Sequence, residues 1–176
     1  MRRLMLTCVL LAGLALPAVA AARAHTARAH TEAKPGYLVV RRGAGDGGVN
    51  GHPIVTLVVR GFVLGSVSSQ GQAKVDIYQL AGEAAPQTTK VSSTKVSWNG
   101  RPGHEYNGNG FRFRATGGYY RVVVRGFGIY LYVGGQGTVK LRGSAFPKKS
   151  DGKYSIDGGT FRSLPAKRIT RKLGQG

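Results

Sequence analysis

The stretch that decides the fold is RVVVRGFGIYLYVGGQG at residues 121–137, because an earlier stretch, LVVRGFVLGSVSSQG at residues 57–71, repeats its pattern. Both contain Val-Val-Arg-Gly-Phe, and both end in Gln-Gly. A glycine within a strand usually marks a bulge or a sharp bend. Each copy therefore predicts a strand bent at Arg-Gly-Phe, a turn at Gln-Gly and a returning strand. We interpret the repeat as a duplicated hairpin unit whose copies pack around one core; two similar strands arising by chance are the alternative.

The segments after each Gln-Gly alternate between apolar and polar residues, as a strand with one buried face does. The segment 111–114 alternates in the same way, with phenylalanines predicted inward and arginines outward. The predicted inward residues are Ala73, Val75, Ile77, Phe111, Phe113, Val139 and Leu141. These segments predict strands that bury one face each in a shared core.

Turn-forming dipeptides separate the short β-branched and aromatic runs throughout the chain. Asn-Gly and Asp-Gly favour tight hairpin turns, and they occur at residues 46–47, 50–51, 99–100, 107–108, 109–110, 151–152 and 157–158. No segment beyond the N-terminus has the 3.6-residue period of an amphipathic helix. The pattern predicts an all-β, antiparallel sandwich or closed barrel built from two related hairpin-containing halves. The single domain is expected at residues 36–165, with halves at about 36–101 and 102–165.

The N-terminus has the layout of a secretory signal peptide. Arg2 and Arg3 precede an uncharged apolar run, and Ala18-Val19-Ala20 supplies the small residues that a signal peptidase accepts. We expect residues 1–20 to be cleaved and the protein to be secreted, either extracellular or associated with the cell wall. The alternative is a signal anchor that remains uncleaved and tethers the chain to a membrane. No membrane span is expected in the mature chain.

Two low-complexity or charged segments flank the predicted domain. Residues 21–35 contain Ala-Arg-Ala-His-Thr twice and predict a disordered leader, and residues 166–176 form a basic tail. The one cysteine, Cys8, lies within the predicted signal peptide. The mature chain therefore has no thiol for a disulfide, a thiolate metal site or a cysteine nucleophile.

Basic residues outnumber acidic ones strongly. Without Arg2 and Arg3, 24 basic and 7 acidic residues remain, a net charge of +17. Such a charge favours polyanions, among them cell-wall or extracellular polymers and, without sequence specificity, nucleic acid. A charged surface that only keeps the protein soluble is the alternative.

The alternating strands place basic residues at predicted outward positions. They suggest a basic sheet face that binds polyanions, formed by Arg60, Lys74, Arg112, Arg114, Arg121, Arg125, Lys140 and Arg142. Ordinary polar-out alternation, with arginine filling exposed positions, is the competing interpretation. Aromatic residues beside basic ones, as at 119–121 and 130–132, also suit stacking ligands, although packing explains most tyrosines. Trp98, before an Asn-Gly turn, is interpreted as part of the core, with an exposed sugar platform as the alternative.

No catalytic pattern emerges from the remaining residues. Residues 43–48 match G-x-G-x-x-G, but β-branched residues follow in place of the helix that a dinucleotide site needs. The acidic residues are scattered, several directly before glycine, and Asp76 is interpreted as a surface residue. His52 and His104 lie outside any recognisable triad, and no metal-ligand spacing is present. We expect no enzyme activity, no cofactor and no metal.

The signal, the glycine-rich bent strands and DGKYSIDGGTFRSLP at residues 151–165 resemble small secreted glycine-rich β-proteins of high-GC actinobacteria. That group is uncharacterised, so the resemblance implies an all-β fold and an extracytoplasmic location but no functional residues. The expected function is a non-enzymatic binding or structural module at the cell surface, which contacts anionic polymer through its basic sheet face. The alternative is a small secreted hydrolase or polysaccharide-processing enzyme with an unrecognised site.

Overall fold

The computed structural model describes residues 34–45, 48–82, 85–143 and 151–174. The predicted signal peptide and nearly all of the predicted leader lie outside the described residues. The strands are β1 (Gly36–Ala44), β2 (Val55–Gly82), β3 (Gln87–Thr89), β4 (Ser93–Trp98), β5 (Arg101–Gly108), β6 (Arg112–Leu141), β7 (Lys153–Ile156), β8 (Arg162–Ser163) and β9 (Ile169–Leu173). A 3₁₀ turn, η1 (Gly48–Asn50), precedes β2. In the part of the chain described, no helix is long and apolar enough to span a membrane.

All nine strands belong to one antiparallel sheet. Its order is β4-β5-β2-β6-β1-β7-β8, with β3 and β9 also paired to β6. This confirms the all-β, antiparallel prediction. The ends of the sheet do not pair with each other, so the prediction of a closed barrel is wrong.

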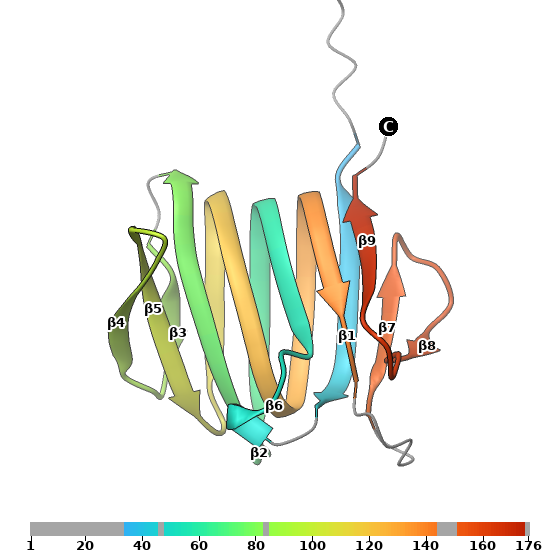
Figure 1. Cartoon of the computed structure of the whole chain (residues 1–176), viewed down its shortest axis with the longest axis horizontal. Coiled ribbons are helices and arrows are strands. Elements are labelled where there is room, and N and C mark those ends of the chain that lie inside the picture. The colour runs from blue at the N-terminus through green and yellow to red at the C-terminus, as the bar shows by residue number, and fades with distance from the viewer. Residues whose placement is uncertain (1–33, 46–47, 83–84, 144–150, 175–176) are drawn as a thin grey trace, which may run out of the picture. The chain divides into compact units, whose positions relative to one another are not determined.

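The two long strands, β2 and β6, fold the sheet into two layers. Figure 1 shows them passing over the upper edge, so that one part of each runs in front and another behind. The near layer contains residues 55–60, 73–82, 119–125 and 136–141, with β5 and β9 beside them. The far layer contains residues 62–67, 112–116 and 129–134, flanked by β1 and β3.

Glycine makes bends possible at both edges, with Gly61 at the upper edge and Gly126 at the opposite edge, where β6 passes from residues 119–125 to residues 129–134. Gly61 has a φ of 147°, and a Cβ there would lie 2.1 Å from the carbonyl oxygen of Gly134. Gly126 has a φ of 106°, and a Cβ there would lie 2.0 Å from the carbonyl oxygen of Gln72. Both glycines follow Val-Val-Arg, so the predicted bends in Arg-Gly-Phe are confirmed.

The core lies between the layers and is formed by the inward residues of both. Residues 55, 57, 59, 63 and 67 of β2 are all buried, so the alternation continues unchanged through the bend at Gly61. The inward predictions are confirmed, because the seven residues predicted to face the core are at most 3% exposed. Tyr106 and Tyr120 are the largest fully buried side chains.

The first parts of the two copies, residues 57–60 and 121–125, lie side by side in the near layer. They run antiparallel, and Leu57 pairs with Val122, its equivalent in the other copy. The two copies differ in structure at their Gln-Gly dipeptides. The first Gln-Gly lies between the paired segments of β2, whereas Gly137 pairs with Val59 and Leu173 inside continuous strand. The predicted turn at Gln136-Gly137 is therefore wrong, because flanking strands on both sides hold that segment extended.

Two further segments bear on the predicted boundaries. Asn99 and Gly100 both have positive φ values and join β4 to β5, as expected for a tight Asn-Gly hairpin. The segment assigned to the basic tail contains β9, which pairs with residues 137–141 of β6 and buries Leu173 in the core. The sheet thus extends beyond residue 165.

Candidate functional site

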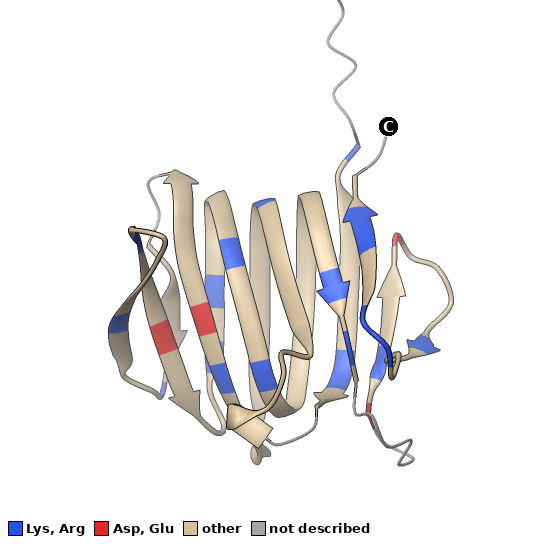
Figure 2. Ribbon diagram, in the orientation of Figure 1, with Lys and Arg blue, Asp and Glu red and all other residues tan. Residues whose placement is uncertain are grey.

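The eight basic residues predicted to share one face are divided between the two layers. Figure 2 shows basic residues on both the near and the far runs of the folded sheet. By register, Lys74, Arg121 and Arg125 lie on the near layer, with Lys140 on its last run and Arg60 at the upper bend. Arg112 and Arg114 lie on the far layer, and Arg142 follows the end of β6.

Two of the near-layer cations are neutralised by carboxylates. The Lys74 Nζ lies 2.7 Å from the Glu105 carboxylate, and the Arg125 guanidinium lies 2.8 Å from that of Asp76. In register, Lys74 faces Arg125 and Asp76 faces Glu105, so like charges that face each other are balanced by their diagonal partners. This part of the near face carries no net charge.

Asp76 is more enclosed than an ordinary surface residue. It points outward on β2, yet it is only 6% exposed, so its interpretation as a surface residue is wrong. Among the described residues, its Oδ1 is the only buried side-chain polar atom without a hydrogen-bond partner. The Arg125 guanidinium supplies the compensating charge through Oδ2.

Aromatic rings cover the next cation along the near face. The Arg121 guanidinium lies 4.4 Å from the centre of the Trp98 ring and 5.5 Å from that of Tyr78. Trp98 is half-buried on the outer side of β4, so its interpretation as a core residue is wrong. Its position follows from the register, in which Trp98 ends β4 at the Asn-Gly turn instead of entering the sheet interior. Arg60 lies over the ring of Tyr119 at 5.5 Å.

The outer side of the far layer is different in character. It carries a group of large side chains from three adjacent strands, which we call the aromatic platform: the exposed Tyr37, Leu64, Tyr130 and Tyr132 and the half-buried Phe62. Tyr132 is 43% exposed and Leu64 is 40% exposed. The rings of Tyr37 and Tyr132 are nearly parallel with centres 6.0 Å apart, and Phe62 lies 5.4 Å from Tyr132. Contiguous exposed apolar surface of this kind usually marks an interaction site.

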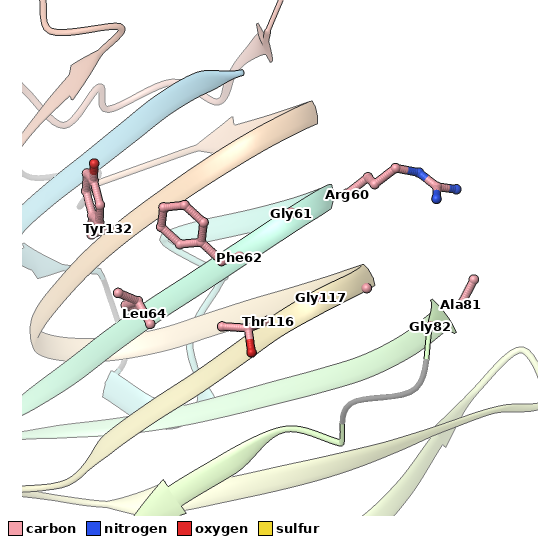
Figure 3. A pocket seen from close by; sticks show the side chains of 10 residues that line it. Arg60, Gly61, Phe62, Leu64, Ala81, Gly82, Thr116, Gly117 and Tyr132 are labelled. Carbon is pink, nitrogen blue, oxygen red and sulfur yellow. The ribbon is translucent and has the colours of Figure 1, made fainter. Parts of the chain in front are cut away.

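Three grooves converge on the platform, and Leu64 lines all of them. The largest has a volume of about 630 Å³ and extends from Tyr132 and Phe62 to Thr116 and the upper bend. Figure 3 shows Tyr132, Phe62 and Leu64 grouped on neighbouring strands of this groove. The other two, of about 410 and 380 Å³, extend toward Arg114 and Arg41 respectively. The grooves therefore form one open depression whose floor includes Phe62, Leu64, Tyr130 and Tyr132, with the Tyr37 ring stacked on Tyr132 beside it.

Arginines lie along both sides of the platform. On one side, Arg112 and Arg114 are exposed and oppose Ser66 and Leu64 in register. On the other side, the register between β1 and β6 shifts between Val40 and Gly43. Arg41 and Arg42 both occupy the resulting bulge and are both exposed beside Tyr130.

The bulge is accompanied by an unusual backbone conformation at Arg42. Arg42 has a φ of 52°, a conformation that residues with a Cβ adopt at a cost of about 1–2 kcal/mol. A bulge redirects side chains that would otherwise alternate. Here it leaves two consecutive arginines on the surface, with Arg41 4.3 Å from the centre of the Phe161 ring. Strained backbone at a candidate site favours a functional role.

Among the residues that the structure describes, no acidic side chain lines these grooves. The acidic residues that the structure describes are Asp76, Glu105, Asp151 and Asp157, and none contributes to the three groove walls. Asp157 lies at the rim, where its carboxylate accepts a hydrogen bond from the backbone amide of Tyr37. The depression consequently combines apolar floor with cationic edges.

The residues that could perform acid–base chemistry are held in structural contacts. His52 Nε2 lies 2.9 Å from the carbonyl oxygen of Gly143, and His104 contacts the Ser93 hydroxyl. Within the described ranges, no three of His, Cys, Asp or Glu cluster as metal ligands would. Burial raises the pKa of Tyr78, Tyr106 and Tyr120, and for Tyr106 it is the sole cause.

Comparison with known proteins finds no matching family model, no matching curated protein and no matching solved structure.

Sequence reasoning named Arg112 and Arg114 but missed the platform beside them. The segment 130–132 was considered as a stacking site, and its two tyrosines do share the exposed side of one strand. Tyr37, Phe62 and Leu64 come from two other strands, and only their register assembles them. The doubled arginine at 41–42 interrupts the alternation of β1, and that interruption was the one local signal of a bulge.

Proposed function

We propose that this protein is a secreted, non-enzymatic binding module that holds an anionic polymer at the cell surface through the far face of its sheet. The net charge of +17 that remains after removal of Arg2 and Arg3 supports attraction to a polyanion. The observation that carries the proposal is the aromatic platform with arginines on both sides and, among the described residues, no carboxylate in its groove walls.

The near face is a weaker candidate for the same role. Lys74 and Arg125 are paired with carboxylates, so a polyanion would have to displace Glu105 and Asp76 to reach them. Arg112 and Arg114 have no such partner among the described residues; Arg114 instead donates a 2.7 Å hydrogen bond to the Gln87 side chain. Their charges remain available to a ligand.

We also propose that the fold is a sandwich formed by one folded sheet and built from two related halves. The pairing of Leu57 with its equivalent Val122, and the glycine bends in both copies, support duplication of a strand-bend-strand unit. Under this view the second unit later changed its Gln-Gly turn into continuous strand. The repeat thus accounts for the fold, whereas the aromatic platform accounts for the proposed binding function.

Retention on immobilised linear polyphosphate tests the binding function, with neutral dextran as the control polymer. The chain recovered after secretion is applied over a salt series. The logarithm of the affinity should fall linearly with the logarithm of the salt concentration, because binding releases counterions. Absence of retention on polyphosphate at low salt would refute the proposal.

The face is tested with two matched double variants. Arg112→Ala with Arg114→Ala should make the slope shallower by about 1.4, since each phosphate contact on a flexible strand contributes about 0.7. Lys74→Ala with Lys140→Ala removes the same charge from the near face without unpairing the buried Asp76, and it should leave the slope nearly unchanged. If the near-face variant made the salt slope shallower and the Arg112/Arg114 variant did not, the site would lie on the near face.

A further inference from the structure

Resting on the function proposed above, we infer that the polymer is a single-stranded nucleic acid whose bases stack on the aromatic platform. The arginines on either side would hold its phosphates. Recognition of this kind combines a cationic track with exposed rings and does not depend on base sequence.

The rings offer surfaces of the required kind. Tyr37 and Tyr132 are 38% and 43% exposed, and their planes differ by only 8°. Tyr130 lies two residues before Tyr132 on the same side of β6, which separates their backbones by about 6.6 Å along the strand. Aromatic rings are thus present at residues 130 and 132 of β6 and across to Tyr37 of β1, and successive bases of one strand would contact successive rings.

The positions of the arginines suit a backbone that runs beside these rings. Arg114 is two strands from Tyr132, with Leu64 between them in register, a distance of about 10 Å at ordinary strand spacing. On the opposite side, Arg41 and Arg42 lie on the strand adjacent to Tyr130. Phosphates could therefore be held at either margin while the bases cover the floor. The planar guanidinium also stacks on bases and pairs with phosphate in a bidentate manner, which an ammonium does not.

The chemistry of the floor disfavours acidic polysaccharides, the main competing class. Sugar hydroxyls need hydrogen-bonding partners when they are buried, because an unpaired polar group is costly. By register Tyr132 lies between Val39 and Leu64, so the floor is largely apolar and carries few polar groups, namely the tyrosine hydroxyls and the side chains of Ser66 and Thr116. The faces of nucleobases are largely apolar and lose little there. A duplex is also disfavoured, because its base faces are already stacked.

The test compares polymers that differ only in their bases. Fluorescence anisotropy would follow binding of an oligothymidine of about 12 nucleotides, within the usual range of site sizes. The matched probe is an abasic oligomer of the same length and charge, and a third is polygalacturonate, an acidic polysaccharide. Oligothymidine should bind at least 10-fold more tightly than either.

Equal affinity for the abasic oligomer would overturn the inference while leaving the polyanion-binding function intact. Tighter binding of polygalacturonate would do the same and assign the platform to sugars. Failure of all three probes, together with failure on polyphosphate, would refute both proposals.

Two variants test the platform itself. Tyr132→Ala should weaken oligothymidine binding by about 5- to 150-fold, the usual effect of removing one stacking ring. The control is Phe127→Ala, since Phe127 is 42% exposed but lines none of the three grooves, and it should have no effect. An equal loss in both variants would overturn the inference.

Arg42→Gly separates binding from folding. Glycine accepts the left-handed backbone at this position without strain, so the thermal midpoint should not fall. The salt slope for oligothymidine should become shallower by about 0.7, as expected for one lost phosphate contact. An unchanged slope would exclude Arg42 from the site and with it the role proposed for the bulge.

Discussion

Replacing Gly61 by alanine should destabilise the fold far more than an ordinary glycine substitution. Gly61 lies where β2 passes from the near to the far layer, and it pairs with Gly118 on one side and Gly135 on the other. Its φ of 147° belongs to a region that is essentially restricted to glycine, which costs other residues about 1–3 kcal/mol.

The added methyl group would also clash with neighbouring backbone atoms. It would lie 2.1 Å from the carbonyl oxygen of Gly134, a backbone atom that cannot rotate away. The strands must separate by about 1 Å, which weakens neighbouring hydrogen bonds worth about 0.5–1.5 kcal/mol each. The total should reach about 3–5 kcal/mol. At about 2–4 °C per kcal/mol for a chain of this size, the thermal midpoint should fall by about 6–20 °C.

Gly117 provides the matched control at the same edge. Its φ is 72°, and no atom lies within 4 Å of the position of an added Cβ. Gly117→Ala should therefore cost only the backbone term of about 1 kcal/mol. Thermal and urea unfolding followed by circular dichroism would measure both variants. If the two midpoints fell by the same amount, the close approach of strands at the bend would not be the reason for glycine there.

The remaining predictions concern the buried polar groups. Arg125→Ala should lower the free energy of unfolding by about 3 kcal/mol, because it leaves the enclosed Asp76 carboxylate without its partner. Lys74→Ala, in a pair whose side chains are both about one-quarter exposed, should cost under about 1 kcal/mol by urea denaturation, and equal losses would contradict the difference in burial. Burial raises the pKa of Tyr106 and Tyr120 above the ordinary 10.0, so the folded state keeps protons that the unfolded chain loses. Stability should therefore fall as pH rises above about 10, and Tyr106→Phe should make that decline shallower; an unchanged decline would contradict it.

The inward face of each strand could be predicted because alternation survives the bends. Val59, Gly61 and Val63 all lie on the inner side of β2 as it passes over the upper edge. Every second residue therefore identifies the core in both layers. Whether a Gln-Gly forms a turn could not be predicted in the same way. Gln70-Gly71 and Gln136-Gly137 are locally alike, and the difference comes from neighbours distant in sequence, since Val59 and Leu173 pair with Gly137 on either side.

The outward faces were harder to predict, because alternation identifies a side but not what covers it. Asp76 does point outward, yet Arg125 and the surrounding near-layer side chains enclose it. Arg121 is likewise outward but lies against the Trp98 ring. Grouping the predicted outward cations into one basic face took no account of the pairing of Arg125 with Asp76 or of the ring that covers Arg121. It also ignored the fold over the upper edge, which places Arg112 on the opposite side of the molecule.

The two outer faces of this sheet differ in how much charge and apolar surface they leave exposed to solvent. That difference indicates which face binds a ligand. On the near face, Asp76 and Glu105 neutralise Arg125 and Lys74, and rings cover Arg121, so little unsatisfied charge remains around these residues, although Lys140 stays exposed. The far face leaves its three tyrosine rings about 40% exposed and accepts a left-handed backbone at Arg42. Both features reduce solubility or stability and neither helps folding. A sheet that needed only to be soluble could have used the near-face arrangement on both sides, so the exposed rings and arginines of the far face are best explained by a ligand that covers them.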